Sequence, residues 1–203
     1  MANHVAVVGA GVMGEAFIAA LIRSGVPASS IVAVVRRPER GEELFTKYSI
    51  SIKPLEEALQ LSDVVILGIK PQGLADLMPQ IAPHLRSNAL VISLLAGKTI
   101  AGISAGLAGH GAIARIMPNT PTLIGKGMAG YSLSPAVTDQ QREFVQKLLA
   151  ATGKAIEIPY FAMSSSPLSG RRTTAVIDGA DIPERIRAAI KASPITPAPT
   201  TAT

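Results

Sequence analysis

The sequence predicts an α/β domain built on a doubly wound, mainly parallel sheet and followed by a short irregular tail. Short runs rich in Val and Ile alternate with stretches of helical character through most of the chain. This alternation is typical of strand–helix–strand units, which place helices on both faces of a sheet. A glycine-rich segment also lies directly between the first such run and the first helical stretch. We therefore expect one domain over residues 1–158 and a dissimilar segment over residues 159–203.

Short apolar runs have the length and the β-branched content of buried strands in a parallel sheet. None approaches the ~20 apolar residues of a membrane span, and the N-terminal residues do not resemble a secretory signal. We therefore expect a soluble, cytoplasmic protein without membrane contact. The predicted strands are His4–Val8, Ile31–Val35, Ser49–Ile52, Val64–Ile69, Leu90–Leu95, Ile113–Met117 and Met128–Leu133.

The stretches between these runs have helical character, and three of them begin with Pro. Proline suits the first position of a helix because its missing N–H would have no partner there. The predicted helices are Val12–Ser24, Pro38–Tyr48, Pro54–Leu61, Pro71–Leu85, Thr99–Leu107 and Thr138–Thr152. After Ser164 only Pro183–Ala192 has helical promise, and we expect much of the tail to be disordered because its composition cannot bury enough apolar surface.

The composition excludes several classes of function. Of the 203 residues, 48% are apolar and 3% are aromatic, with no Trp, so we do not expect a stacking platform for single-stranded nucleic acid. The formal charge is +5, but the basic residues are scattered, which argues against a nucleic-acid partner. Because Cys is absent, disulfides, thiol catalysis and thiolate metal sites are excluded, and we expect no metal site.

Three glycines follow the first predicted strand with the spacing of the Rossmann dinucleotide fingerprint. Gly9 allows a tight turn, Gly11 lets the backbone approach a pyrophosphate, and Gly14 lets the helix pack closely on the strand. The ligand would meet the unpaired N–H groups and the positive dipole end of the helix, beside Val12 and Met13. The alternative interpretation is a glycine-rich turn with a purely structural role.

The end of the second predicted strand indicates which dinucleotide binds. An NAD site usually places Asp or Glu there to bind the ribose 2′-hydroxyl, but this chain carries Arg36 and Arg37, and no carboxylate precedes Glu39. A guanidinium would instead pair with a 2′-phosphate. The pattern favours NADPH, with Arg36 the closer residue, while NADH stays possible. The alternative is that both arginines are solvated residues at a strand end.

Two further segments follow predicted strands, at the sheet edge where open α/β sheets bind their ligands. The first runs from Ile69 to Gln72 and contains Lys70 and Pro71; its structural explanation is a proline that starts a helix beside a solvated lysine. The second, RIMPNTP, places Asn119 between two prolines that would fix a rigid turn. The Asn119 amide could face a ligand, or could equally cap the backbone of the turn.

The segments GAGVMGEAFIAALI, LGIKPQ, SLLAGKTIAGI and RIMPNTPTLIGKGM occur in this order and at compatible spacing. Together they resemble the N-terminal half of pyrroline-5-carboxylate reductase, the NAD(P)H-dependent enzyme that makes proline. The resemblance runs from the first predicted strand to about Phe161, and the MPNTP segment is its most specific element. It implies a Rossmann domain that binds NADPH and an oxidoreductase of amino-acid biosynthesis.

The resemblance also implies roles for individual residues. It places Gly11, Val12, Met13, Arg36, Ile69, Lys70 and Pro71 at the cofactor. It places Ala96 and Asn119 near the nicotinamide, with Asn119 and Thr120 near the substrate. The implied reaction is hydride transfer to the cyclic imine pyrroline-5-carboxylate, which gives L-proline. Orientation and proximity can supply much of its rate enhancement, and we identify no catalytic side chain.

The resemblance stops after Phe161, where this family continues with a SGSGPAY-like segment that holds the substrate carboxylate and with a helical domain that forms the dimer. Here the chain reads FAMSSSPLSGRR. We expect a truncated product, or out-of-frame translation of a longer gene, in which the homo-oligomer interface is lost. A genuine lineage-specific ending is the alternative.

The coding DNA tests the out-of-frame hypothesis directly. We predict that a single-nucleotide shift near the codons for residues 160–170 restores a SGSGPAY-like continuation. Sequencing this region gives the answer, and the hypothesis is wrong if neither alternative frame contains such a segment.

Overall fold

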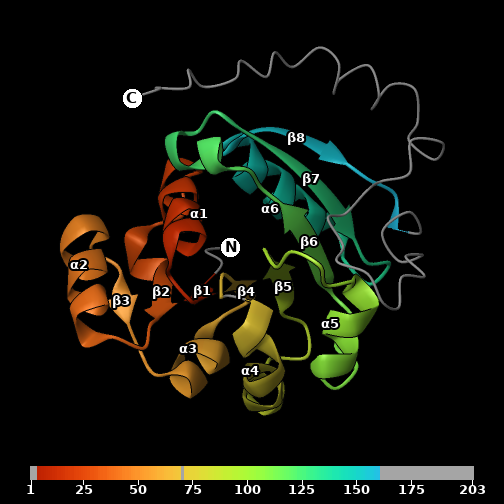
Figure 1. Ribbon diagram of the computed structural model, residues 1–203, viewed down its shortest axis with the longest axis horizontal. Coiled ribbons are helices and arrows are strands. Elements are labelled where there is room, and N and C mark those ends of the chain that lie inside the picture. Colours follow the sequence, from red (N-terminus) through yellow and green to blue (C-terminus); the bar gives the residue numbers. More distant parts are fainter. Residues whose placement is uncertain (1–3, 70, 161–203) are drawn as a thin grey trace, which may run out of the picture. The chain divides into compact units, whose positions relative to one another are not determined.

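A single sheet organises the residues described by the computed structural model, which are residues 4–69 and 71–160 (Figure 1). The predicted tail from residue 161 onward, including Pro183–Ala192, and Lys70 lie outside the described residues. The eight strands follow the order β3-β2-β1-β4-β5-β6-β7-β8 across the sheet. Their bounds are β1 Val5–Val8, β2 Ile31–Val34, β3 Ser51–Ile52, β4 Val64–Leu67, β5 Leu90–Ser93, β6 Ile113–Met117, β7 Gly127–Leu133 and β8 Gly153–Glu157.

Six neighbouring strands, from β3 to β6, are parallel, and β1 pairs on one side with β2 and on the other with β4. Only at the β6–β7 pair does the direction reverse, and β8 then runs parallel to β7. The carboxyl ends of β1, β2, β4, β5 and β6 therefore share one edge of the sheet. The predicted doubly wound, mainly parallel architecture is confirmed.

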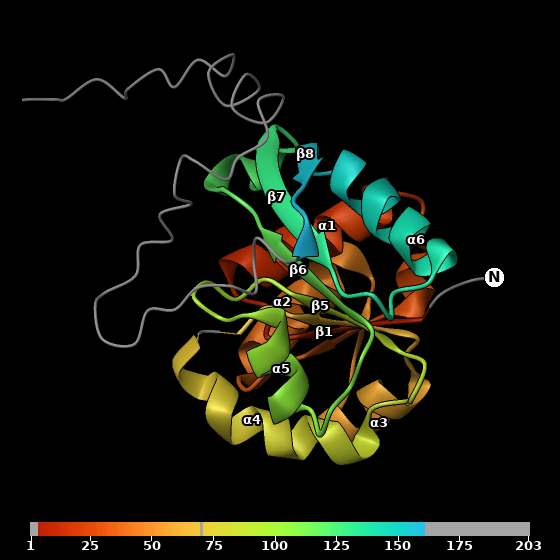
Figure 2. The same cartoon turned by 90° about the vertical axis from the view of Figure 1, so that its right-hand side faces the viewer.

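Helices cover both faces of this sheet, as the two views in Figures 1 and 2 show. One face carries α1 (Val12–Arg23), α2 (Pro38–Tyr48) and α6 (Asp139–Ala150), and the other carries α3 (Leu55–Leu61), α4 (Leu74–Ile81) and α5 (Ile100–Gly106). Short 3-10 turns, η1 to η4, lie at Ala28–Ser30, Pro71–Gly73, Ala82–His84 and Thr120–Ile124. None of the helices in the described part of the chain is long and apolar enough to span a membrane.

Successive strand residues enter two separate hydrophobic cores. In β1, Val5 and Val7 pack with α1, α2 and α6, whereas Ala6 and Val8 pack with α3, α4 and α5. All four side chains are buried. Full burial of a Val or Ile side chain stabilises the fold by about 1.5–3 kcal/mol, so the central strands need apolar residues on both faces. This requirement explains why they read as continuous apolar runs rather than as alternating patterns.

Local signals place the helix ends close to the predicted bounds. Pro38 begins α2, as predicted. The Thr138 hydroxyl accepts from the Gln141 backbone N–H while the Gln141 side chain accepts from the Thr138 N–H, a reciprocal cap that starts α6. At α5 the Thr99 hydroxyl accepts from the Gly102 N–H. These side chains satisfy N–H groups that a helix start leaves without partners.

Three sequence expectations require correction. The helix predicted over Pro71–Leu85 is a 3-10 turn, the short helix α4 and a second 3-10 turn. Pro79 is accommodated inside α4, whereas Pro83, in the second 3-10 turn, lacks the N–H that a continuing α-helix needs. The strand predicted from Ser49 begins only at Ser51, since Ser49 instead ends α2. Strand β8 was not predicted, because its residues are half-buried or exposed and include two charged side chains.

Ser49 gives a test of this helix end. It adopts a left-handed conformation (φ 55°, ψ 33°) and donates its N–H to the Phe45 carbonyl at 2.8 Å. Glycine tolerates this backbone without steric cost, so we predict that Ser49→Gly raises the free energy of unfolding by about 0.5–1 kcal/mol in urea denaturation. The matched control is Thr46→Gly. Because Thr46 lies within α2, glycine should there lower the free energy of unfolding by a similar amount. Equal effects at the two positions would contradict the explanation.

Candidate functional site

The β1–α1 turn contains the first of the predicted cofactor residues. Gly9 has a φ of +88°, which favours glycine, and its N–H donates to the Val34 carbonyl of β2 at 3.0 Å. A Cβ at this position would lie 2.5 Å from Ile69 Cγ2 and 2.9 Å from the Ile69 backbone N. Gly9 is therefore required both by the turn and by the close approach of the segment that follows β4.

Gly14 packs directly on the same turn. A Cβ at Gly14 would overlap the Gly9 carbonyl oxygen. Gly68, which follows β4, approaches the same oxygen, and its Cβ would lie 2.5 Å from Gly9 O and 3.1 Å from Gly14 Cα. Gly68 was missed in the sequence analysis, although a glycine that ends a buried strand is the signal of close backbone approach.

Gly11, unlike Gly9 and Gly14, has open space around it. Nothing lies within 4 Å of a Cβ built on it, and it is exposed. Gly11 precedes the first residue of α1, and no side chain caps the N–H groups of this helix end. Val12 is 66% exposed and Met13 is half-buried beside it. The start of α1 therefore offers uncapped N–H groups and open space to an anion.

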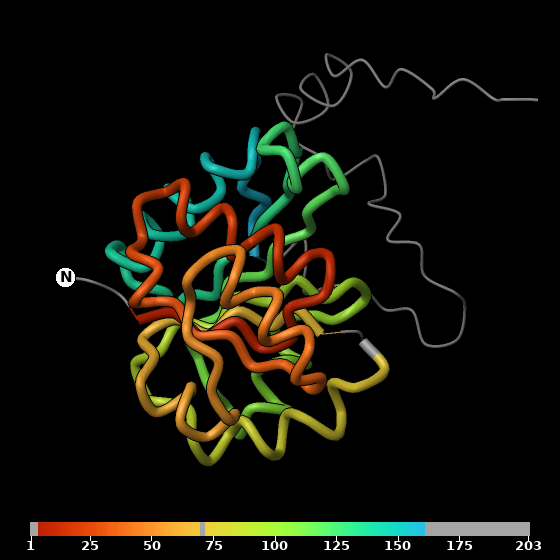
Figure 3. Tube along the Cα trace, turned by 90° about the vertical axis from the view of Figure 1, so that its left-hand side faces the viewer, coloured from red at the N-terminus to blue at the C-terminus, as the bar shows by residue number. Residues whose placement is uncertain are grey.

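Arg36 and Arg37 lie next to this turn, because β2 pairs with β1 in a register that places Val34 beside Val8. Figure 3 shows the two segments side by side, β1–α1 in red and β2–α2 in orange. Both arginines are exposed, and neither side chain bonds to another residue of the described part of the chain. Arg37 precedes α2 without capping it through its side chain. Two guanidinium groups without partners among the described residues thus lie beside the glycine turn.

Three more predicted residues follow the ends of neighbouring strands. Ile69 is half-buried after β4, and Pro71 begins η2. Ala96 is exposed in the turn after β5, directly before Gly97. Lys70, between Ile69 and Pro71, lies outside the described residues. Because β1, β4 and β5 are adjacent and parallel, their ends bring these residues to the same edge as the glycine turn.

Asn119 and Thr120 follow β6 at this edge, and both are exposed. The Asn119 Oδ1 accepts a hydrogen bond from the Met128 backbone N–H at 2.9 Å. Since a backbone N–H can only donate, this bond fixes the orientation of the amide. The Nδ2 group bonds to none of the residues that the structure describes, so it is left as a donor. The sequence left ligand contact and capping of the turn backbone as alternatives. The structure uses Oδ1 to join the turn to β7 at Met128, and ligand contact stays a prediction.

A charged cluster, missed in the sequence analysis, supports the glycine turn from α2. Arg40 donates to the Ala10 carbonyl, to Glu43 and to Glu15, which lies in the first turn of α1. Lys47 and Tyr48 also donate to Glu15, at 2.7 and 3.0 Å. Burial alone would raise the pKa of Glu15, but the hydrogen bonds from Lys47, Arg40 and Tyr48 outweigh it and hold this pKa at about 2.

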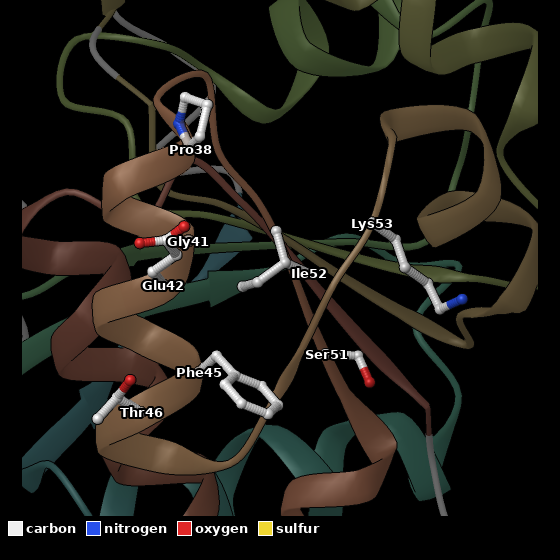
Figure 4. Close-up of a pocket in the computed structure, with 8 residues that line it drawn as sticks. All are labelled: Pro38, Gly41, Glu42, Phe45, Thr46, Ser51, Ile52 and Lys53. Carbon is white, nitrogen blue, oxygen red and sulfur yellow. The ribbon is translucent and has the colours of Figure 1, made fainter.

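A pocket opens elsewhere, between α2 and the edge strand β3 (Figure 4). None of the predicted cofactor or substrate residues lines it. Its lining residues are Pro38, Gly41, Glu42, Phe45, Thr46, Ser51, Ile52 and Lys53. This pocket lies on the outer edge of the sheet rather than at the strand ends that hold the glycine turn, so it is not part of the candidate site.

Gly68→Ala tests the close packing around Gly9. Because the new methyl group would overlap Gly9 O and crowd Gly14, we predict a loss of about 1–3 kcal/mol in the free energy of unfolding, measured by chemical denaturation. Gly73→Ala is the matched control, since nothing lies within 4 Å of a Cβ there and its φ is −89°. Its stability should stay within about 0.5 kcal/mol of the parent. A silent Gly68→Ala variant would contradict the packing described.

Comparisons with known proteins show which family this chain resembles. Residues 4–97 match the family model described as NADP oxidoreductase coenzyme F420-dependent. The chain is 34% identical over 158 residues to the pyrroline-5-carboxylate reductase of Corynebacterium melassecola, a match that covers 76% of this chain and 58% of that relative.

Two solved structures share the fold. A pyrroline-5-carboxylate reductase from Coxiella burnetii has a TM-score of 0.70 and 24% identity, over 78% of this chain and 59% of that one. The pyrroline carboxylate reductase of Plasmodium falciparum, solved with NADP bound, has a TM-score of 0.67 and 21% identity, over 77% and 57%. The chain thus spans less than two thirds of the length of these relatives. Over residues 1 to about 161, it resembles the N-terminal Rossmann domain of pyrroline-5-carboxylate reductases.

Proposed function

We propose that residues 1–158 form the NADP(H)-binding half of a pyrroline-5-carboxylate reductase. One observation carries this proposal. The open backbone at Gly11, at the uncapped start of α1, lies beside two exposed arginines whose side chains bond to no other described residue. Together these features supply the two anion sites that a phosphorylated dinucleotide needs, one for the pyrophosphate and one for the 2′-phosphate.

The glycine turn would hold the pyrophosphate. A phosphate oxygen can approach the backbone closely because Gly11 carries no side chain, and the N–H groups at the start of α1 can donate to it. Gly9 and Gly14 contribute indirectly, since they allow the turn and the close packing of α1. Val12 and Met13 are the first helical residues beside the ligand.

Arg36 and Arg37 would bind the 2′-phosphate. Hydrogen bonds between charged groups contribute about 1.5–3 kcal/mol each, which corresponds to roughly a tenfold to hundredfold preference for NADPH over NADH. Both guanidinium groups are exposed, so they can turn toward the ligand without breaking an existing ion pair among the described residues.

The remaining residues would place the nicotinamide against the substrate. Ile69, Lys70 and Pro71 would line the path of the dinucleotide after β4, and Ala96 would border the nicotinamide after β5. When bound, the dihydronicotinamide supplies a hydride to the imine carbon of pyrroline-5-carboxylate. Asn119 presents an amide donor at this end of the sheet, and Thr120 adds a hydroxyl group. A protonated imine already attracts hydride, so orientation can supply much of the catalysis.

Non-catalytic NADP(H) binding is the alternative function. It is favoured by the loss of resemblance beyond Phe161, where the family's SGSGPAY-like segment holds the substrate carboxylate. A carboxylate without its donors binds weakly, so we expect this chain to bind NADPH while reducing pyrroline-5-carboxylate very slowly.

The test combines binding and turnover on the full chain. NADPH and NADH are titrated by fluorescence against the parent and an Arg36→Met/Arg37→Met variant. We predict that the variant loses about tenfold to hundredfold in affinity for NADPH and little for NADH. Arg86→Met is the control, because Arg86 pairs with Asp63 at the opposite edge of the sheet. Equal losses for both dinucleotides, or none, would refute the phosphate role, and oxidation of NADPH at a normal rate with pyrroline-5-carboxylate would refute the binding-only alternative.

A further inference from the structure

Arg40 makes one contact that the side chains of Arg36 and Arg37 do not make. Its Nε donates to the Ala10 carbonyl at 3.1 Å, and Ala10 lies between Gly9 and Gly11 in the turn. Its Nη2 donates to Glu15 of α1, and its Nη1 donates to Glu43 at 2.7 Å. All three nitrogens of this guanidinium are therefore engaged, and two of them hold the β1–α1 segment.

Glu15 explains why a cation is needed at this point. Its carboxylate lies in the first turn of α1, close to the helix start at which an anion would bind. An unpaired negative charge there would repel a pyrophosphate. The side chains of Glu15 and Arg40 are only 19% and 22% exposed, so solvent screens their interaction less than it screens a surface pair. Arg40 and Lys47 together neutralise this carboxylate.

We propose that Arg40 is a positioning residue of the dinucleotide site, which holds the glycine turn through the Ala10 carbonyl and neutralises Glu15 without contacting the dinucleotide. This inference rests on the proposed function, and it assigns different tasks to the three arginines of this region. Arg36 and Arg37 face the ligand, whereas Arg40 faces the turn. The planar guanidinium suits this task because it can donate to Ala10 and Glu15 at the same time.

The proposal has a distinctive consequence for specificity. The glycine turn would bind the pyrophosphate, which NADPH and NADH share. Loss of Arg40 should therefore weaken both dinucleotides by the same factor, whereas loss of the 2′-phosphate ligands weakens NADPH alone. A purely structural role would lower the melting temperature without this uniform loss of affinity in the folded protein.

The experiment uses the full chain with Arg40→Met and Arg40→Lys, and with Glu43→Gln as the matched control, which removes only the exposed contact of Arg40. NADPH and NADH affinities are measured by titration at a temperature where each variant is folded. Arg40→Met should lose about fivefold to thirtyfold in affinity for both. Arg40→Lys should recover only part of this loss, because Lys keeps the charge but cannot donate to Ala10 and Glu15 with a planar guanidinium. Glu43→Gln should have the affinities of the parent.

A second measurement follows the stability of the β1–α1 turn in the absence of any ligand. Amide hydrogen exchange at Gly9 and Glu15, whose N–H groups donate to Val34 and Gly11, should be faster in Arg40→Met and unchanged in Glu43→Gln. Unchanged exchange and unchanged affinity would overturn the proposal, as would a loss for NADPH alone or full recovery by Arg40→Lys. If the parent binds neither dinucleotide, the proposed function fails. The exchange rates then decide alone whether Arg40 holds the turn.

Discussion

The contact of the Gly9 carbonyl with Gly14 and Gly68 is the constraint on which the rest of the site depends. Three backbone segments meet there: the turn after β1, the first turn of α1 and the end of β4. None has room for a side chain, so the helix can approach the sheet closely only because all three positions are glycine. This approach directs the start of α1 toward the edge where β1, β2, β4, β5 and β6 end. Arg36, Ala96 and Asn119 lie at the same edge, because each follows the end of one of these strands.

The charges around this contact are arranged in two layers. The inner layer pairs Arg40 and Lys47 with Glu15, and Arg40 also with Glu43, so two cations meet two carboxylates and little net charge is left beside the turn. The outer layer consists of Arg36 and Arg37, which are exposed. Under the proposed function, a ligand with several phosphates would meet two guanidinium groups without partners among the described residues and the N–H groups at the helix start, while the Arg40–Glu15 pair would hold the turn. The distinction between the layers depends on hydrogen bonding rather than on residue type.

The sequence predicted the features that depend on local pattern. The strand runs, the glycine spacing and Pro38 all depend on neighbours along the chain, and each was placed within a few residues. Gly68 and Arg40 depend on partners distant in sequence: Gly68 on the turn at Gly9, and Arg40 on Ala10 of the same turn and Glu15 of α1. No local pattern marks Arg40, and the glycine after β4 signals a close backbone approach without showing which segment approaches. Strand β8 was missed for a related reason, since half-exposed residues at the end of a sheet carry a weak apolar signal.

The Asn119 side chain uses one end to anchor the backbone and leaves the other end as a donor. Its oxygen anchors the turn to β7 through the Met128 N–H, and its nitrogen has no partner among the residues described. An isosteric carboxylate would keep the anchor and change only the outer atom. Evolution can therefore alter what this position offers to a ligand without disturbing the hairpin that carries it, and can do so by a change of a single atom.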